Sequence, residues 1–364
     1  MWACAAPCSY VPLRPSASLR PCVPAALVPV SPCDPAVLHE FSIEDDSQPT
    51  LIAALRSHLP GGLSWSKVRR LVADCKVTIG DVVCIDEARR LTAGETVRVF
   101  ERPVPKPPGE KDVRVVYVDQ HVIIAEKPSG MLTLRRANER AWPWSRRQQQ
   151  PTLDECVPRI IREHAAQKNK SDKLHQHLLR LFPVHRIDRD TSGLLLFARN
   201  KDAQTNIIAQ FARHEAVRRY FALVPGRVAT QRIESQLIRD RGDGMRGSTT
   251  DTSIGQQAVT HITTLRTLGD YSELECRLET GRTNQIRIHL AELGHPICGD
   301  VKYRGPLGAD PIPDDSRARR LCLHAAQLKV EHPETGQVMD FETPWPRSMQ
   351  VYLNRLHAHS ISRR

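Results

Sequence analysis

The segment from Val184 to Gly193 concentrates side chains that are able to act on a substrate. It holds the carboxylates of Asp188 and Asp190 among arginines, and it leads directly into the apolar run 194–198. An apolar run of strand length bounded by Gly predicts a buried strand. Functional side chains are often carried by loops at the ends of rigid strands. The segment therefore reads either as a site with a reactive carboxylate or as a polar turn with surface ion pairs.

The order of motifs along the chain favours the first reading. Residues 185–193 read His-Arg-Ile-Asp-Arg-Asp-Thr-Ser-Gly. This resembles the His-Arg-Leu-Asp-x-x-Thr-Ser-Gly motif that holds the catalytic aspartate of the RluA-type RNA pseudouridine synthases, with Ile187 in place of Leu. Other motifs of that family resemble residues 116–131, 218–226, 281–290, 293–300, 323–325 and 332–336. The resemblance covers roughly residues 113–346 and therefore a whole domain.

The resemblance implies an isomerase that converts uridine in RNA to pseudouridine. This reaction breaks the C1'–N1 bond, turns the uracil, joins its C5 to C1' and releases the C5 proton, so we expect no metal and no cofactor. By resemblance Asp188 is the catalytic carboxylate, Tyr220 stacks on the base and helps to remove the C5 proton, and Arg287 pairs with Asp188. A nearby guanidinium keeps a carboxylate ionised and aims it. Without the motifs, Tyr220 is typical of a core aromatic, whereas Arg287 fits a surface residue on an alternating strand as well as it fits a site residue.

Other polar residues of these motifs have weaker assignments. The family pattern leaves position 190 variable, so we interpret Asp190 as a loop or capping carboxylate. We expect Arg186 and Arg282 to contact RNA phosphates, although either fits a structural role as well. Asn284 stands where the family usually has His, so no specific contact is carried over to it.

Residues 48–101 are expected to form a small α/β RNA-binding domain. Apolar spacing predicts a helix near residues 51–55, a second helix capped by Ser64 or Ser66, and a hairpin over 77–83. The unit resembles the ribosomal-protein S-four-like domain that many family members carry, with Gly80-Asp81 in place of the usual Asn-Gly turn. Its basic side chains form either a phosphate-binding face or a solvated helix surface; they are Lys67, Arg69, Arg70 and Lys76.

The composition bounds the class of protein. A chain of 364 residues has room for about two domains. Its 52 Lys and Arg exceed its 41 Asp and Glu, giving a net charge of +11 that favours an anionic partner such as RNA. No apolar run reaches the roughly 18 residues of a membrane span. The 10 cysteines lack zinc-site spacing and predict buried thiols in a reducing compartment, so we expect a cytoplasmic monomer without membrane contact.

The predicted fold class is α/β (α+β), and the resemblance implies the pseudouridine synthase fold with a mixed, largely antiparallel central sheet. Spacing predicts helices over 153–164 and 203–211, and strands over 217–224, 257–265, 271–278 and 337–342. The polar stretches 135–150 and 167–176 are expected to be surface loops. The predicted domains are a disordered or targeting-like extension (1–47), the RNA-binding domain (48–101), a linker (102–112), the catalytic domain (113–350) and a tail (351–364). Organelle import is expected if residues 1–40 are a transit peptide.

Three functions fit these observations to different degrees. An RNA-binding domain before the catalytic domain favours large-subunit ribosomal RNA as the substrate, and transfer RNA is the alternative. A non-catalytic ribosome-assembly factor would not need Asp188, Tyr220 and Arg287 together. A carboxylate hydrolase acting on nucleosides or sugars would need a second acid, and the motifs nominate only one.

Overall fold

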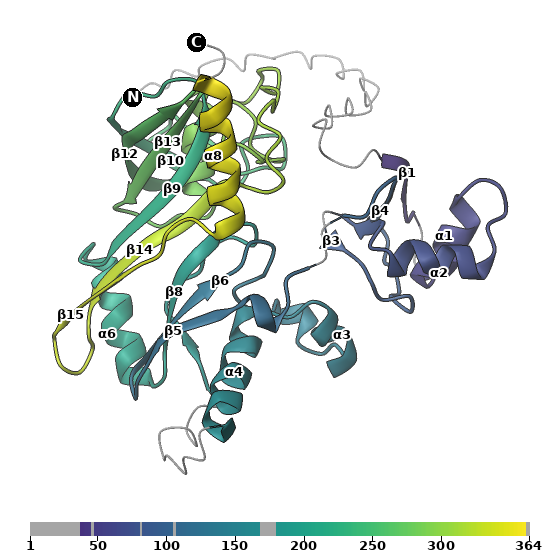
Figure 1. Cartoon of the computed structure of the whole chain (residues 1–364), viewed down its shortest axis with the longest axis horizontal. Helices are drawn as coiled ribbons and strands as arrows, with labels where there is room; N and C mark the ends of the chain where they lie inside the picture. Colours follow the sequence, from purple (N-terminus) through teal and green to yellow (C-terminus); the bar gives the residue numbers. More distant parts are fainter. Residues whose placement is uncertain (1–36, 45–46, 81, 105–106, 168–179, 362–364) are drawn as a thin grey trace, which may run out of the picture.

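The computed structural model describes residues 37–44, 47–80, 82–104, 107–167 and 180–361. These residues form a 4-stranded sheet and an 11-stranded sheet, which Figure 1 shows as two separate bodies. Residues 1–36 lie outside the described part, and so does most of the stretch 167–176 that the sequence predicts to be a loop. Within the described part, no helix is both long enough and apolar enough to pass through a bilayer.

The small sheet has the strand order β1-β4-β2-β3, and two helices pack on it. The predicted cap of the second helix is confirmed, because the Ser64 side chain accepts from the backbone N of Lys67 at 3.4 Å. The predicted hairpin is also confirmed, with Gly80 in the left-handed region (φ 57°) after its first strand. The elements are β1 (Val37–Ser42), α1 (Leu51–His58), α2 (Trp65–Ala73), β2 (Val77–Ile79), β3 (Val82–Val83) and β4 (Thr96–Phe100).

The predicted domain boundary at residue 48 is wrong, because β1 belongs to this sheet. Strand β1 pairs antiparallel with β4, and Phe41 lies opposite Val97. The side chains of β1 alternate between partly buried and exposed, with Leu38 53% exposed. The strand therefore lacks the clear apolar alternation that predicts a strand from sequence.

The large sheet is mixed and largely antiparallel, as predicted. Its main path is β11-β10-β12-β13-β9-β14-β8-β6-β5, and β15 and β7 pair with β14 and β8. Among the described pairs, β14 and β8 alone run parallel. The strands are β5 (Arg114–Val118), β6 (Val122–Lys127), β7 (Phe182–Pro183), β8 (Ser192–Ala198), β9 (Val217–Pro225), β10 (Gln231–Ile238), β11 (Gly247–Thr249), β12 (Gln256–Leu268), β13 (Tyr271–Leu278), β14 (Leu323–Glu331) and β15 (Val338–Glu342).

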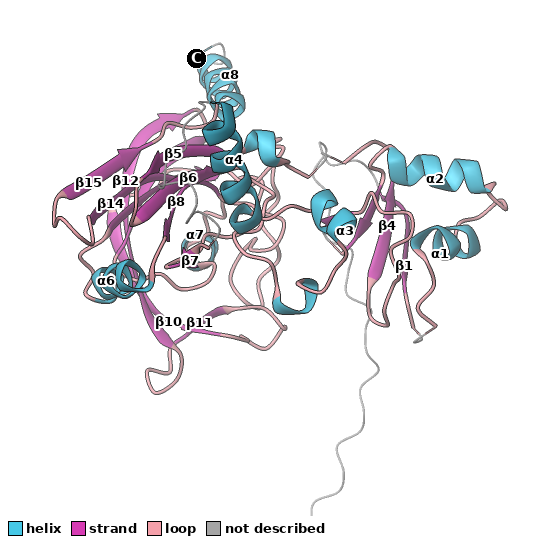
Figure 2. Cartoon of the chain, turned by 90° about the horizontal axis from the view of Figure 1, so that it is seen from below, coloured by secondary structure: helices cyan, strands magenta, loops and turns pink. Residues whose placement is uncertain are grey.

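Helices cover both faces of this sheet, so its interior strand β8 is buried throughout. Leu195 and Phe197 of β8 face one apolar cluster together with α4, whereas Leu194 and Leu196 face another with α6. Figure 2 shows α4 and α6 on opposite sides of the strands. The helices are α3 (Trp144–Gln149), α4 (Leu153–Gln167), α6 (Lys201–Ala212), α7 (Gln285–Glu292) and α8 (Arg347–Ile361), with 3-10 turns η1 (Glu110–Asp112) and η2 (Ala137–Glu139).

Two further predictions are wrong. The tail predicted to begin at residue 351 is part of α8, and Met349 and Leu353 of this helix are buried in the main core. The stretch 135–150 is not a plain surface loop, because it contains η2 and α3. The Arg135 side chain is buried there and donates to Glu155 of α4 at 2.6 Å. The local polarity of the sequence does not predict this ion pair, because its two partners lie 20 residues apart.

Candidate active site

Asp188 lies on the loop that leads from β7 into β8, and the main chain of this loop is held by residues that follow β6. Three donors from residues 129–133 reach carbonyl oxygens on both sides of Asp188. These hydrogen bonds fix the loop without using the carboxylate itself. They run from Thr133 Oγ1 to Ile187 O (2.9 Å), from Gly130 N to Arg189 O (2.9 Å) and from Ser129 Oγ to Asp190 O (2.6 Å).

Lys127, the last residue of β6, holds the same loop through its side chain. Its side chain is fully buried, and Nζ donates to the carbonyl oxygens of Pro128 (3.0 Å), Met131 (2.7 Å) and Arg189 (2.8 Å). Burial lowers the pKa of Lys127 to about 7, although the carboxylates of Asp190 and Asp188 oppose this shift. Lys127 thus joins the loop after β6 to the loop before β8.

Arg287 lies on α7 and is buried, so the alternative of a surface arginine on an alternating strand is wrong. Its main partner is Asp300, whose oxygens accept from Nε at 2.7 Å and from Nη2 at 2.8 Å. Nη1 lies 4.0 Å from Oδ2 of Asp188. The expected pair of Arg287 with Asp188 is therefore present as a longer electrostatic contact beside a shorter bidentate one.

The electrostatic setting of Asp188 combines burial with positive charge. The side chain is 22% exposed. Burial raises the pKa of Asp188 above its usual range, while the charges of Arg287, Arg186 and Lys127 oppose this rise. Burial also works against the charge of Arg287, but the hydrogen bonds and charge of Asp300 raise its pKa overall. The arginine stays protonated and favours the ionised form of Asp188.

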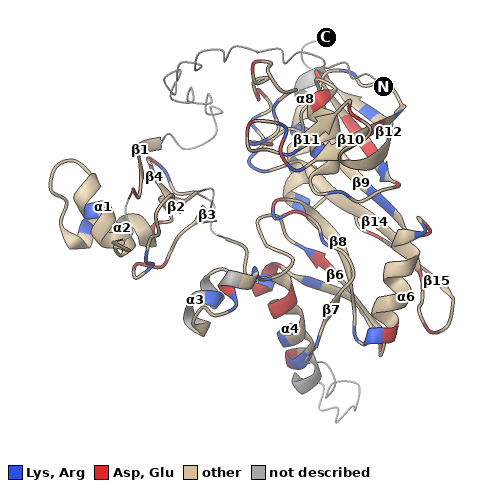
Figure 3. Ribbon diagram, turned by 180° about the vertical axis from the view of Figure 1, so that it is seen from behind, with Lys and Arg blue, Asp and Glu red and all other residues tan. Residues whose placement is uncertain are grey.

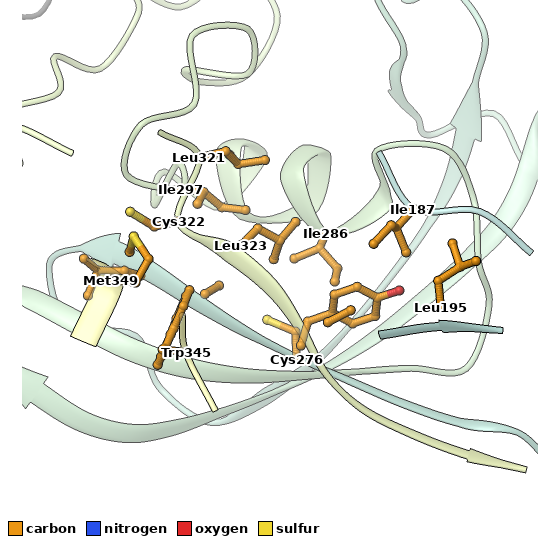
Figure 4. Close-up of a cluster of buried hydrophobic side chains, with 14 of the residues drawn as sticks. Ile187, Leu195, Cys276, Ile286, Ile297, Leu321, Cys322, Leu323, Trp345 and Met349 are labelled. Atoms are coloured by element: carbon orange, nitrogen blue, oxygen red, sulfur yellow. The ribbon is translucent and has the colours of Figure 1, made fainter. Parts of the chain in front are cut away.

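Tyr220 lies on β9 and is 7% exposed, within the main apolar cluster. Its register partners are Cys276 on β13 and Ala325 on β14. Burial raises the pKa of Tyr220; Arg218 opposes the shift, and the charge of Asp188 adds to it. The tyrosine is thus both a core aromatic and a neighbour of the carboxylate. Figure 4 shows Ile187, Leu195, Ile286 and Cys276 gathered in this cluster.

Other residues of the 185–193 motif have structural roles. Nε2 of His185 accepts from the backbone N of Leu196 at 3.1 Å. Gly193 has φ +115°, and a Cβ there would lie 2.3 Å from the carbonyl oxygen of Ala325. Asp190 pairs with its neighbour Arg189, whose Nε donates to it at 3.0 Å, which agrees with its interpretation as a loop carboxylate.

The predicted RNA-binding residues are dispersed. Arg186 and Arg282 are exposed on the large body, and Nε of Arg282 donates to Gln257 O at 3.1 Å. The basic residues of the small body lie on or next to α2, where Figure 3 shows basic positions on the ribbon. There Lys67 is exposed, Arg69 pairs with Glu87 (3.2 Å), Arg70 pairs with Asp74 (3.9 Å), and Lys76 donates to Glu101 O (2.8 Å).

Lys127 and Asp300 lie within the motif ranges 116–131 and 293–300, but the sequence predicts no role for either. The sequence does offer one signal for both residues, since each is a charged residue next to a Gly-containing turn: Lys127 precedes Pro128-Ser129-Gly130, and Asp300 follows Gly299. The partners, however, are a set of carbonyl oxygens and an arginine on another element, which no local pattern identifies. Within the described part of the chain, no group of three or more His, Cys, Asp or Glu side chains is arranged to hold a metal ion.

Comparisons with known proteins identify the family of the chain. Residues 121–292 match the family model described as RNA pseudouridylate synthase. The chain is 32% identical over 260 residues to ribosomal large subunit pseudouridine synthase D of Zymomonas mobilis, covering 70% of this chain and 77% of that protein. The Escherichia coli protein of the same name is 28% identical over 314 residues, covering 81% and 87%. The solved structure of human RNA pseudouridylate synthase domain containing 1 aligns with a TM-score of 0.49 at 21% identity, over 68% and 90%. By its match to the Zymomonas mobilis protein, the chain belongs to the RNA pseudouridylate synthases, a family of isomerases.

Proposed function

We propose that this protein isomerises uridines in large-subunit ribosomal RNA, with Asp188 as the catalytic carboxylate. The substrate class rests on relatives whose names specify the large ribosomal subunit. The role of Asp188 rests mainly on its combination of partial burial, a backbone held by neighbouring residues, and a guanidinium 4.0 Å away. A positioned carboxylate can act on a glycosidic centre as a nucleophile or as an ion-pairing group.

In this proposal the other residues keep the roles that the resemblance implies. Tyr220 stacks on the target uracil and helps to remove the C5 proton, and Arg287 stabilises the charge of Asp188. The exposed guanidiniums of Arg186 and Arg282 contact phosphates around the target. The enzyme unstacks the uridine from the RNA, and phosphate contacts offset the cost of unstacking.

Release of tritium from C5 tests the function directly. Large-subunit ribosomal RNA transcribed with [5-³H]uridine is incubated with the protein in EDTA, and transfer RNA serves as the competing substrate. We expect wild type and Asp190→Asn to release tritium from ribosomal RNA, because the Asp190 carboxylate accepts hydrogen bonds only from the neighbouring Arg189 among the described residues, and Asn can keep one of them. Asp188→Asn should lose at least about a thousandfold in rate, since the reacting group itself is removed.

Several outcomes would change the proposal. Tritium release by Asp188→Asn at the wild-type rate would remove Asp188 from the chemistry. Release from transfer RNA alone would change the substrate class. RNA binding without release from either RNA would favour the assembly-factor alternative.

A further inference from the structure

The guanidinium of Arg287 approaches Asp188 without donating a hydrogen bond to it. Nε and Nη2 are occupied by Asp300, at 2.7 and 2.8 Å. Nη1 donates to Oδ1 of Asn284 at 3.1 Å, and the same nitrogen lies 4.0 Å from Oδ2 of Asp188. The last distance fits an ion pair but exceeds the range of a hydrogen bond.

Asn284 is itself fixed by its backbone and by a second contact. It precedes α7 in the left-handed conformation (φ 59°, ψ 17°), which Asn tolerates better than most residues. Its Nδ2 donates to the hydroxyl of Tyr303 at 3.0 Å. The Tyr303 ring lies next to the arginine, with Cζ of Arg287 5.0 Å from the ring centroid. The amide of Asn284 thus bridges the two groups, and rotating it would break both contacts.

We propose that Asn284 is a positioning residue for the reaction at Asp188, an inference that rests on the proposed function. By holding Nη1, Asn284 keeps Arg287 where its charge stabilises the Asp188 carboxylate while the carboxylate oxygens stay available to the substrate. A short charge-assisted hydrogen bond from Nη1 would occupy a lone pair of Asp188 and make its charged form less reactive.

Two substitutions at this position predict opposite shifts. Asn284→Gly removes the amide and keeps the left-handed backbone, which Gly adopts freely. Without the amide acceptor, the whole guanidinium can tilt on its Asp300 contacts and bring Nη1 towards Asp188. The acidic limb of the pH profile of kcat/KM then moves to lower pH, and the plateau kcat falls about tenfold or more. Asn284→Asp is nearly isosteric, and its carboxylate competes with Asp188 for Nη1 of Arg287. It also adds a negative charge near Asp188, which raises the pKa of Asp188, so the acidic limb moves to higher pH.

The pH profile of kcat/KM also depends on the other titratable and charged groups around Asp188, which both Asn284 variants leave unchanged. These groups are Lys127 from β6, Arg186 and Asp190 from the same loop, Tyr220 from β9, Arg287 from α7, and Tyr303 and Asp300 after α7. Because their charges are unchanged, the difference between two variants at one position reports on Asn284.

The measurement is single-turnover tritium release from [5-³H]uridine-labelled large-subunit ribosomal RNA between pH 4.5 and 8. Gln48→Gly is the matched control, since Gln48 also has a left-handed backbone (φ 48°) but lies in the small body. Opposite shifts of the limb in the Gly and Asp variants support the inference. Unchanged limbs, or shifts in the same direction, overturn it.

Tyr303→Phe keeps the inference testable if Asn284→Gly fails to fold. This change removes the hydroxyl that accepts from Asn284 and keeps the ring beside Arg287. It should shift the limb in the same direction as Asn284→Gly but by less, and an unshifted limb would count against the positioning role. Absence of tritium release from wild type at every pH would instead contradict the proposed function.

Discussion

At the residue scale, neutral hydrogen bonds to the backbone position the Asp188 loop, and a charged group interacts with the Asp188 carboxylate. Carbonyl oxygens at 187, 189 and 190 accept hydrogen bonds that place the loop. Among the described residues, the Asp188 carboxylate accepts no hydrogen bond, and Nη1 of Arg287 lies 4.0 Å from it. A side chain positioned through its backbone keeps its oxygens available for chemistry. Buried carbonyl oxygens need donors in any case, so the same bonds also stabilise the fold.

His324 makes the free energy of unfolding depend on pH. It is fully buried at the start of β14, and its Nδ1 lies 2.9 Å from Oγ of Ser192 on β8. Burial lowers the pKa of His324 to about 3, and the charge of Arg320 adds to the shift. An unfolded His titrates near 6.5. Between about pH 6.5 and 3 the unfolded chain therefore binds a proton that the folded chain does not, so stability falls as the pH falls.

The expected loss from this group is about 1.4 kcal/mol for each pH unit below 6.5. His324→Gln removes the titration and keeps a side chain that can hydrogen-bond Ser192. Urea unfolding at pH 7, 6 and 5 should show a shallower decline of the unfolding free energy for the variant than for wild type. Parallel declines would mean that the ring does not remain neutral in the folded protein.

At the element scale, α7 shows where reading the sequence fails and why. Ile286, Ile288 and Leu290 alternate with polar residues, a period of two that is typical of a strand. The segment is a helix in which Gln285–Ala291 are all buried, and a helix surrounded by protein loses the one-sided pattern that predicts helices. By contrast, β8 was predictable, because a short uninterrupted apolar run after a Gly is what a strand buried on both faces requires.

The motifs named Asp188, Tyr220 and Arg287, but they did not identify what holds Arg287. Asp300 lies 13 residues further along the chain and reaches Arg287 only through the turn after α7. Asn284 departs from the usual His of the motif, so the motif predicts no contact for it. Its left-handed backbone gives a physical reason for that exchange, since Asn and His both tolerate this conformation better than most residues.

The parallel pair of β8 and β14 leaves no room for a side chain at Gly193. Ala325 lies opposite Gly193 in this pair, and an added Cβ would meet backbone atoms of Ala325 at 2.3 to 2.8 Å. Gly193→Ala should therefore separate the strands and destabilise the large body by about 3 kcal/mol or more, through strain and a clash that only backbone movement relieves. Tritium release should be lost with it, because the strand carries the Asp188 loop.

Gly294→Ala provides the matched control, because Gly294 also has a positive φ (+84°) but no atom lies within 4 Å of an added Cβ. This variant should lose only about 1 to 2 kcal/mol from backbone strain. Thermal and urea unfolding of the two variants separate the clash from the strain. Similar losses in both would show that β8 and β14 can move apart at little cost.

At the scale of the whole molecule, the positive charge is spread rather than concentrated. The net charge of +11 coexists with many ion pairs, and Figure 3 shows acidic and basic positions interspersed on α4. Exposed ion pairs contribute little to stability, so an RNA phosphate can replace their acidic partner at small cost. The basic residues of α2 fit this description, because the side chains of Arg69 and Arg70 are 59% and 83% exposed in their pairs.

If the small body binds RNA, the contribution of α2 should be visible in the salt dependence of binding. Each phosphate contact contributes about 0.7 to 0.9 to the slope of log affinity against log salt. The triple variant Lys67→Gln/Arg69→Gln/Arg70→Gln should lower that slope by about 2 and raise KM for tritium release, with kcat unchanged, because these residues lie on a different body from Asp188. Filter binding to ribosomal RNA between 50 and 300 mM salt measures the slope.

A second triple variant, with the same change of charge but on the large body, tests whether the effect is specific to α2. Arg114, Arg213 and Arg232 are also exposed and paired with acidic residues, namely Glu126, Glu215 and Glu234. Their replacement by Gln should change the slope much less, because a positive residue matters for binding only where RNA lies against it. Equal slopes for the two triple variants would mean that RNA senses the overall charge of the protein and that α2 is an ordinary solvated helix.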